Sequence, residues 1–386
     1  MYKRQGLNLF PDDLNFLSEL AGEYFADSEY IKAQDFYERM VELDPSARHY
    51  AQRAGNELRI DMFDEAKRDL DLAAERNPNL TYIEILRGTL CMHLENYADG
   101  LIHYQNALAL SEKNEETWYR IYRDMADIYC RMQNYEMALD CLRKNAELYH
   151  QEEDTRSILE ILRMQGEYQQ AYTTGDAFIE ENGAENSQQI LNELVSCAQA
   201  QGDREKFDFY NRMLRNQFSA NYNLGRYLIY QGNHEESLNA FLAAADYGRR
   251  NINNNIEIAK LFLRLKNKKE AKKYAAMVCD EIPADYMRIG YDRAYHLVRS
   301  AEAFIILGNY TEAKRRLEQA LTSRKCDFCK YSGCIDAYCA LVYLYCILGD
   351  EALVEKYVKE GKEVSQFDYD ILHLPDRFLK KRGLFK

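Results

Sequence analysis

Small and aromatic residues recur along this chain in a fixed order, at intervals of 30 to 42 residues. In residues 14–47 the order is Ala21, Tyr24, Ala33, Tyr37 and Pro45. The third of these positions, called the landmark below, recurs as Ala33, Ala66, Gly100, Ala138, Ala171, Phe207, Ser237, Ala271, Ala313 and Val354. At Phe207 and Val354 the pattern is degenerate, because a larger residue replaces the small one. A period of this length, in long stretches without proline, predicts pairs of helices stacked in series.

Turn-forming residues precede most of the landmarks. They are Asn96, Asn134, Gly166, Gly202, Gly232, Gly308 and Gly349. Glycine and asparagine tolerate the left-handed backbone that ends a helix, so we expect each to form the corner between a first helix (helix A) and a second helix (helix B). Such a hairpin cannot cover its own apolar face, and neighbouring hairpins must therefore stack on one another.

The pattern resembles the tetratricopeptide repeat family over roughly residues 10–362. The best matches are Asn223-Leu224-Gly225 leading to Ser237, Phe241 and Ala244, Met125-Ala126 with Tyr129 leading to Ala138, and the stretch Gly308–Ala313. The resemblance implies an all-α fold, a right-handed α-solenoid superhelix of about ten helix hairpins. The alternative is an irregular helical bundle.

We divide the chain into five segments on this basis. Residues 1–13 are an N-terminal leader, residues 14–321 a solenoid of about nine hairpins, and residues 322–334 a cysteine-containing loop. Residues 335–362 form the last hairpin, and residues 363–386 a C-terminal capping segment. The alternative for that last segment, which mixes Phe378, Leu379, Leu384 and Phe385 with basic residues, is contact with an anionic surface.

Charge is distributed unevenly along the chain. The net charge of −13 divides into −19 over residues 1–200, with 19 basic and 38 acidic residues, and +6 over residues 201–386, with 31 and 25. An acidic half argues against nucleic-acid binding, which needs a dominant positive field. The sequence holds no apolar run long enough to span a membrane and no recognisable export signal. We expect a cytoplasmic protein with reduced cysteines.

In the tetratricopeptide family the inner stripe of each helix A lines a concave groove. Registered on the landmarks, the candidate groove residues here are Arg120, Arg123, Arg131, Arg156, Arg163, Asn192, Tyr222, Arg226, Tyr230, Lys260 and Arg264. Tyr82, Ile85, Thr89, Met92, Ser196 and Gln199 complete the stripe. Cations outnumber the two acids in it, Asp127 and Glu160, which predicts a groove for an acidic or C-terminal peptide. Alternatively, these cations pair with neighbouring acids and form a solvated face.

One cysteine cluster has the spacing of a metal site. Cys326, Cys329, Cys334 and Cys339 follow the pattern Cys-x2-Cys-x4-Cys-x4-Cys, which resembles a zinc knuckle with cysteine replacing the usual histidine. A structural zinc would order this long connection. The other interpretations are a reduced set that binds nothing and a redox pair of Cys326 and Cys329. Apart from this zinc ion, we expect the chain to require no cofactor.

The sequence contains no catalytic constellation: no HExxH pair, no phosphate-binding glycine loop and no nucleophile elbow. We therefore expect a non-enzymatic scaffold that binds a protein or peptide. The alternatives are a signalling regulator, a chaperone-associated module, and, less favoured by the acidic first half, an RNA-binding helical repeat.

Overall fold

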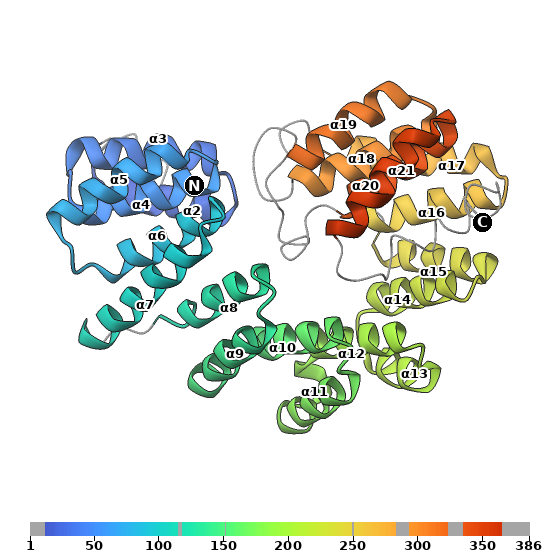
Figure 1. The fold of residues 1–386 in the computed structure, drawn as a ribbon, viewed down its shortest axis with the longest axis horizontal. Coiled ribbons are helices and arrows are strands. Elements are labelled where there is room, and N and C mark those ends of the chain that lie inside the picture. Colours follow the sequence, from blue (N-terminus) through green and yellow to red (C-terminus); the bar gives the residue numbers. More distant parts are fainter. Residues whose placement is uncertain are drawn as a thin grey trace. The chain divides into compact units, whose positions relative to one another are not determined.

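A computed structural model describes residues 12–114, 118–150, 152–248, 251–282, 293–322 and 335–364. These residues form twenty α-helices and one short 3-10 turn, with no β-strand among them, so the all-α prediction is confirmed. Figure 1 labels the helices along the chain. Their bounds are α2 Leu14–Ala26, α3 Tyr30–Leu43, α4 Ala47–Arg59, α5 Phe63–Arg76, α6 Thr81–His93, α7 Tyr97–Asn114, α8 Ile121–Arg131, α9 Tyr135–Tyr149, α10 Glu152–Met164, α11 Tyr168–Asn182, α12 Gln188–Gln201, α13 Arg204–Met213, α14 Gln217–Tyr230, α15 His234–Tyr247, α16 Ile252–Arg264, α17 Lys268–Glu281, α18 Arg293–Leu307, α19 Tyr310–Thr322, α20 Ile335–Leu348 and α21 Glu351–Val364.

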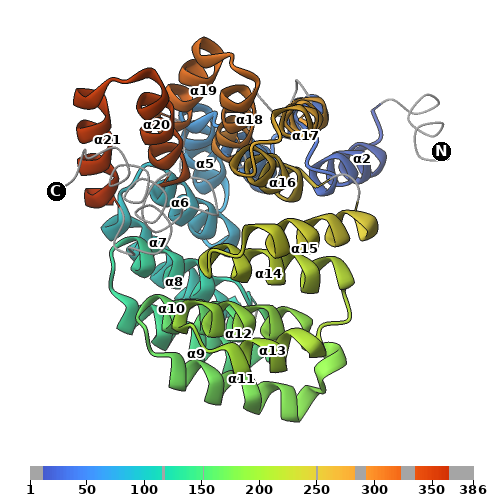
Figure 2. The ribbon, with the colours of Figure 1, turned by 90° about the vertical axis from the view of Figure 1, so that its right-hand side faces the viewer.

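The chain divides into two compact units, Met1–Asn145 and Ala146–Lys386, with the boundary inside α9. Each is described by itself. In unit 1, α2 packs on α3, α4 on α5 and α6 on α7. In unit 2 the same pairing joins α10 with α11, α12 with α13, α14 with α15, α16 with α17, α18 with α19, and α20 with α21. Figure 2 shows α14 and α15 side by side, as one such antiparallel hairpin.

One backbone arrangement recurs at every described corner between helix A and helix B. At the α14–α15 corner the N–H of Gly232 donates to Ile229 O, that of Asn233 to Leu228 O, and that of Ser237 to Asn233 O. The last bond is present at all ten landmarks: each landmark N–H donates to the carbonyl four residues earlier, over 2.9–3.1 Å. The degenerate landmarks Phe207 and Val354 also form this hydrogen bond, and both side chains are buried. The landmark therefore marks the first turn of helix B.

The corner chemistry differs from the prediction at the two asparagines. The left-handed residues there are Glu95 (φ 59°) and Gln133 (φ 63°), one position before Asn96 and Asn134. Asn134 instead begins the next helix, where its Oδ1 accepts the N–H of Met137 over 3.3 Å. An asparagine side chain is a good helix N-cap, which explains the residue type without a left-handed backbone. At Gly166, Gly202, Gly232, Gly308 and Gly349 the backbone is left-handed, as predicted.

Close approach of helices A and B depends on pairing a glycine with an aromatic ring sixteen residues later. A Cβ at Gly225 would lie 2.9 Å from the Phe241 ring, and a Cβ at Gly88 would lie 2.8 Å from the Tyr104 ring. Phe241 and Tyr104 are both fully buried. The small residue in helix A thus leaves space for the large residue of helix B. This contact sets how closely the two helices of each such hairpin approach.

Candidate functional site

The helices A of unit 2 form one continuous row. α10 packs on α12, α12 on α14, α16 on α18, and α18 on α20. Tyr222 of α14 packs in one apolar cluster with Ile258 and Leu261 of α16, which closes the remaining step. The side of this row that carries the predicted groove residues is called the A-face of unit 2. It is the candidate functional site.

A chain of ion pairs crosses three helices of the A-face. Lys260 of α16 donates to Glu302 of α18 over 2.6 Å and to Glu257 over 3.1 Å. Arg299 of α18 donates to Glu302 over 2.9 Å and to Asp336 of α20 over 2.6 Å. Glu302 is 13% exposed and Lys260 28% exposed. Neighbouring hairpins are therefore joined by charged side chains that solvent still reaches.

These charges stabilise one another in their ionised forms. Burial acts to raise the pKa of Glu302, but Lys260 and Arg299 outweigh burial and hold the pKa below its ordinary value. Burial acts in the opposite sense on Lys260, and Glu257 and Glu302 raise its pKa above the ordinary lysine value. A cluster held in this way presents fixed donors and acceptors over the whole physiological pH range.

Polar contacts continue along the row on α10, α12 and α14. Arg163 of α10 pairs with Glu193 of α12 over 3.4 Å, and Asn223 of α14 donates to Asn192 of α12 over 3.1 Å. The Ser196 hydroxyl donates to Asn192 O over 3.0 Å. Two buried donors on the same helices, Arg156 Nε and Gln199 Nε2, have no hydrogen-bond partner within the described residues.

The predicted groove residues of unit 2 lie on its helices A, and acids accompany the cations there. Arg156, Arg163, Arg226, Lys260 and Arg264 lie on helices A, as do Asn192, Tyr222 and Tyr230. Beside them lie four acids that were not predicted from the sequence, together with Arg299: Glu193, Glu257, Glu302 and Asp336. The spacing of three between Glu257 and Lys260, and between Arg299 and Glu302, is a signal that could have found them.

In unit 1 the equivalent face carries an aromatic pair. Tyr82 of α6 stacks on Trp118, with ring centroids 5.8 Å apart, and its hydroxyl would lie 2.9 Å from a Cβ at Gly55 of α4. Arg120, Arg123 and Arg131 follow Trp118 along the chain, and Arg120 lies 3.8 Å from Asp124. Burial raises the pKa of Asp124 to about 7, against the effect of Arg120.

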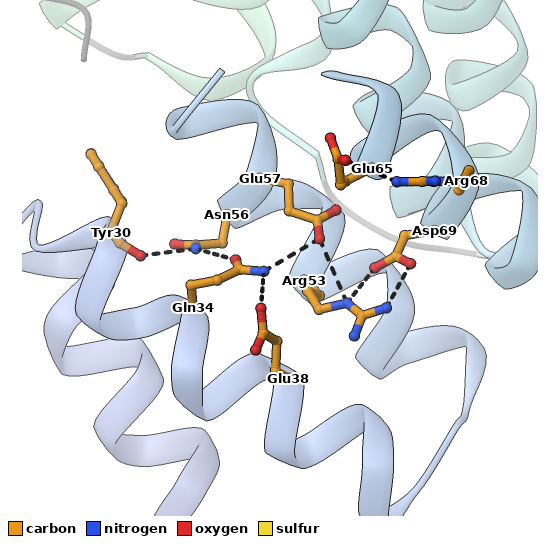
Figure 3. A network of polar contacts seen from close by, with 9 residues as sticks. All are labelled: Tyr30, Gln34, Glu38, Arg53, Asn56, Glu57, Glu65, Arg68 and Asp69. Atoms are coloured by element: carbon orange, nitrogen blue, oxygen red, sulfur yellow. Dashed lines mark hydrogen bonds and ion pairs between the residues drawn. The ribbon is translucent and has the colours of Figure 1, made fainter. Parts of the chain in front are cut away.

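Unit 1 also contains a buried polar network between α3, α4 and α5 (Figure 3). Arg53 binds Asp69 through two hydrogen bonds, of 2.6 and 2.8 Å, and lies 3.7 Å from Glu57. Gln34 donates to Glu57 over 3.3 Å and to Glu38 over 3.2 Å, and accepts from Asn56 over 2.8 Å. Glu57 is 3% exposed. Its Oε2 has no hydrogen-bond partner within the described part of the chain.

Glu57 meets more negative than positive charge in this network. Burial and Asp69 raise the pKa of the Glu57 carboxyl to about 7, although Arg53 and Gln34 act to lower it. Glu65 of α5 raises it slightly further and is itself bound to Arg68 over 2.8 Å. Arg53 therefore lies close to two buried carboxylates, those of Asp69 and Glu57. It donates both of its hydrogen bonds to Asp69, so Glu57 has fewer donors.

The predicted metal site lies largely outside the described residues. Cys326, Cys329 and Cys334 fall in residues 323–334, so only Cys339 is described, as a half-buried residue on α20. Groups of three or more potential metal ligands do not occur within the described ranges. The seven described cysteines form no disulfide. None of the described helices is both long and apolar enough to cross a membrane.

The fold and its recurring corner define a helical-repeat protein built from tetratricopeptide-like hairpins. No protein-family model matches the sequence, and no curated protein matches it. Among solved structures, the Cut9–Hcn1 hetero-tetramer of the APC/C gives a TM-score of 0.42 at 12% identity, over 98% of this chain and 86% of that one. A tetratricopeptide repeat protein from Parabacteroides merdae gives 0.42 at 14% identity, over 68% and 97%. Yeast Tom70 gives 0.31 at 15% identity, over 96% of both chains.

Proposed function

We propose that this chain is a protein-interaction scaffold whose A-face in unit 2 holds an extended segment of another protein. The observation that carries the proposal is the row of half-exposed polar side chains on successive helices A. Arg163, Lys260 and Arg299 are each fixed in position by a partner on the neighbouring helix A, as Lys260 is by Glu302. Side chains ordered in advance lose little conformational entropy when a partner binds, so more of the interaction energy appears as affinity.

Hydrogen-bonding capacity on the A-face supports the same function. Lys260 and Arg163 remain 28% and 29% exposed while paired, so each can donate further to the carbonyls that an extended backbone offers at every residue. The half-buried ring of Tyr222 adds rigid contact area. Since acids accompany the cations along this face, the proposed segment is extended and of mixed charge, and it need not be acidic throughout.

Charge reversal on the A-face tests this proposal. Arg226 and Arg264 are exposed residues on α14 and α16, so the double variant Arg226→Glu and Arg264→Glu should fold normally. We expect it to lose most of the protein that the wild-type chain captures from its native lysate, by roughly tenfold or more, which corresponds to about 1.4 kcal/mol. The measurement is affinity capture with quantitative mass spectrometry.

A matched control separates the face from the net charge. Arg212 on α13 and Lys359 on α21 are exposed cations on helices B, and Arg212→Glu with Lys359→Glu changes the net charge equally. Capture should survive in this control. Equal loss in both double variants, or no loss in either, would contradict the A-face assignment.

A further inference from the structure

A dense basic patch lies at the corner between α16 and α17, away from the A-face pairs. The sequence from Lys266 to Lys273 reads Lys-Asn-Lys-Lys-Glu-Ala-Lys-Lys. All five lysines are exposed, and this set is called the lysine patch. Lys273 pairs with Glu270 over 3.4 Å. Lys266, Lys268, Lys269 and Lys272 form no ion pair or hydrogen bond with an acid in the described ranges.

The placement of these lysines is unfavourable to the fold in three ways. Lys268 and Lys269 occupy the first turn of α17, where the helix dipole is positive and a cation is repelled. Lys268 and Lys272 are four residues apart, as are Lys269 and Lys273, so like charges face each other on one side of the helix. Glu270 in the same turn offsets part of this repulsion through its pair with Lys273, whereas Lys268, Lys269 and Lys272 have no such partner within the described residues.

Lys266 adds a backbone cost. Its φ is +64°, in the left-handed region that favours glycine. The other described corners of this kind in unit 2 all have glycine at the equivalent position: Gly166, Gly202, Gly232, Gly308 and Gly349. A lysine here is the exception within unit 2, whereas the corners of unit 1 have Ser28, Asp61, Glu95 and Gln133 at this position. At Lys266 the backbone cost coincides with the repulsion between the lysines, and such a combination of unfavourable local terms is expected at functional sites.

The charges and rings around the lysine patch indicate which class of partner binds it. Residues 201–386, which include the patch, carry a net charge of +6, so an anionic segment meets no net repulsion from this half of the chain. A short acidic segment senses only charges within about 8 Å at physiological salt. Lysine ammonium groups act as point charges. The ring beside the patch, Tyr274, is half-buried and stacked on Phe262, with the Lys273 ammonium 5.6 Å from its centroid, so these contacts already occupy it in place of a nucleotide base.

We propose that the lysine patch is a second docking surface, which binds a short carboxylate-rich segment of a partner protein. The occupant supplies the negative charge that the helix terminus and its lysines lack. Binding at this surface is electrostatic and weakens as salt rises. It is independent of the A-face, because its residues lie on the α16–α17 corner and on helix B.

The test uses the full chain and a fluorescein-labelled oligoglutamate peptide as the probe. The patch variant changes Lys268, Lys269 and Lys272 to Glu. The control variant changes Arg212, Lys314 and Lys356 to Glu. The three control residues are exposed cations on other helices B of unit 2, so both variants change the net charge equally. By fluorescence anisotropy at low salt we expect the patch variant to lose at least about tenfold in affinity, and the control less than about threefold.

Thermal unfolding gives a second readout that a structural role would not produce. If the lysines are retained for binding at a cost to the fold, the patch variant should unfold at a temperature higher by roughly 2 °C or more. The triple change to Gln should shift the transition in the same direction. A lower unfolding temperature in both variants would show that the lysines serve the fold, and would overturn the proposal.

Competing occupants are distinguished in the same assay. Tighter binding of a uridine homopolymer or of phosphatidylserine vesicles than of oligoglutamate would assign the patch to a long polyanion instead. Equal weakening in the patch variant and the control would mean that net charge alone matters. Either result would overturn the assignment to an acidic protein segment.

Discussion

Single residues in this protein show where packing leaves charge uncompensated. Glu57 lies between α3, α4 and α5, faces Asp69 and Glu38, and shares one arginine with Asp69. Its raised pKa means that the folded state holds a proton which the unfolded chain has released at the same pH. Stability conferred by this proton is present at acidic pH and is lost as pH rises from the ordinary carboxyl range through about 7.

The change Glu57→Gln tests directly whether Glu57 is protonated in the folded state. The neutral amide keeps the shape of the side chain and removes the charge, so the variant should gain more stability at pH ~8 than at pH ~5. A rise of the Glu57 pKa from its ordinary value to about 7 corresponds to a difference on the order of 3 kcal/mol between the gains in unfolding free energy at the two pH values. Chemical denaturation of wild type and variant at both pH values measures it. An equal effect at both would show that Glu57 is ionised in the fold throughout.

At the scale of single residues, the sequence predicted positions better than partners. The landmark register assigned Tyr222, Lys260 and Arg163 to first helices of hairpins, and they lie on α14, α16 and α10, because the repeat period fixes where each helix A falls. It did not predict that Arg163 meets Glu193 of the next hairpin. A contact between hairpins depends on the offset of two helices, and the sequence pattern within one helix carries no information about that offset.

Among the structural elements, the corner between helices A and B is the most regular feature. The hydrogen bond from the landmark N–H recurs at all ten landmarks, whether the left-handed residue is glycine or not. This bond therefore does not select the left-handed residue, whose effect on the stability of the corner comes from backbone energy. A side chain costs about 1–2 kcal/mol in this conformation relative to an unstrained one.

Two substitutions with opposite expected signs test that interpretation. A Cβ at Gly232 (φ 78°) would meet no atom within 4 Å, so Gly232→Ala should destabilise by about 1 kcal/mol through backbone strain only. Gln133 has φ 63°, and Gln133→Gly should be neutral to stabilising by a few tenths of a kcal/mol or more. Equilibrium unfolding of both variants checks the pair. Loss of stability at both positions would mean that side-chain contacts, and not φ, decide these corners.

Element boundaries followed from sequence more closely than corner chemistry did. The predicted repeat begins at residue 14, where α2 begins, and the predicted last hairpin begins at residue 335, where α20 begins. The asparagine corners were misassigned by one residue, because asparagine is suited both to a left-handed backbone and to an N-cap. Residue preference alone cannot choose between two neighbouring positions that favour the same side chain.

Across the whole molecule, the periodic pattern predicted an array of hairpins, and the described contacts form two compact units, Met1–Asn145 and Ala146–Lys386, each built of stacked hairpins. The uneven charge of the two halves is a property of sequence that the fold does not explain. On our account it reflects separate binding surfaces, of which the A-face of unit 2 is the principal one.

Site-specific photo-crosslinking tests that account most directly. A photoreactive benzophenone amino acid is placed at Arg226 on α14 or at Asn239 on α15, two exposed positions on helices A and B of the same hairpin. After irradiation in the native lysate, we expect a specific crosslinked protein from position 226 and none from position 239. Crosslinks from position 239 alone, or equally from both positions, would contradict binding at the A-face.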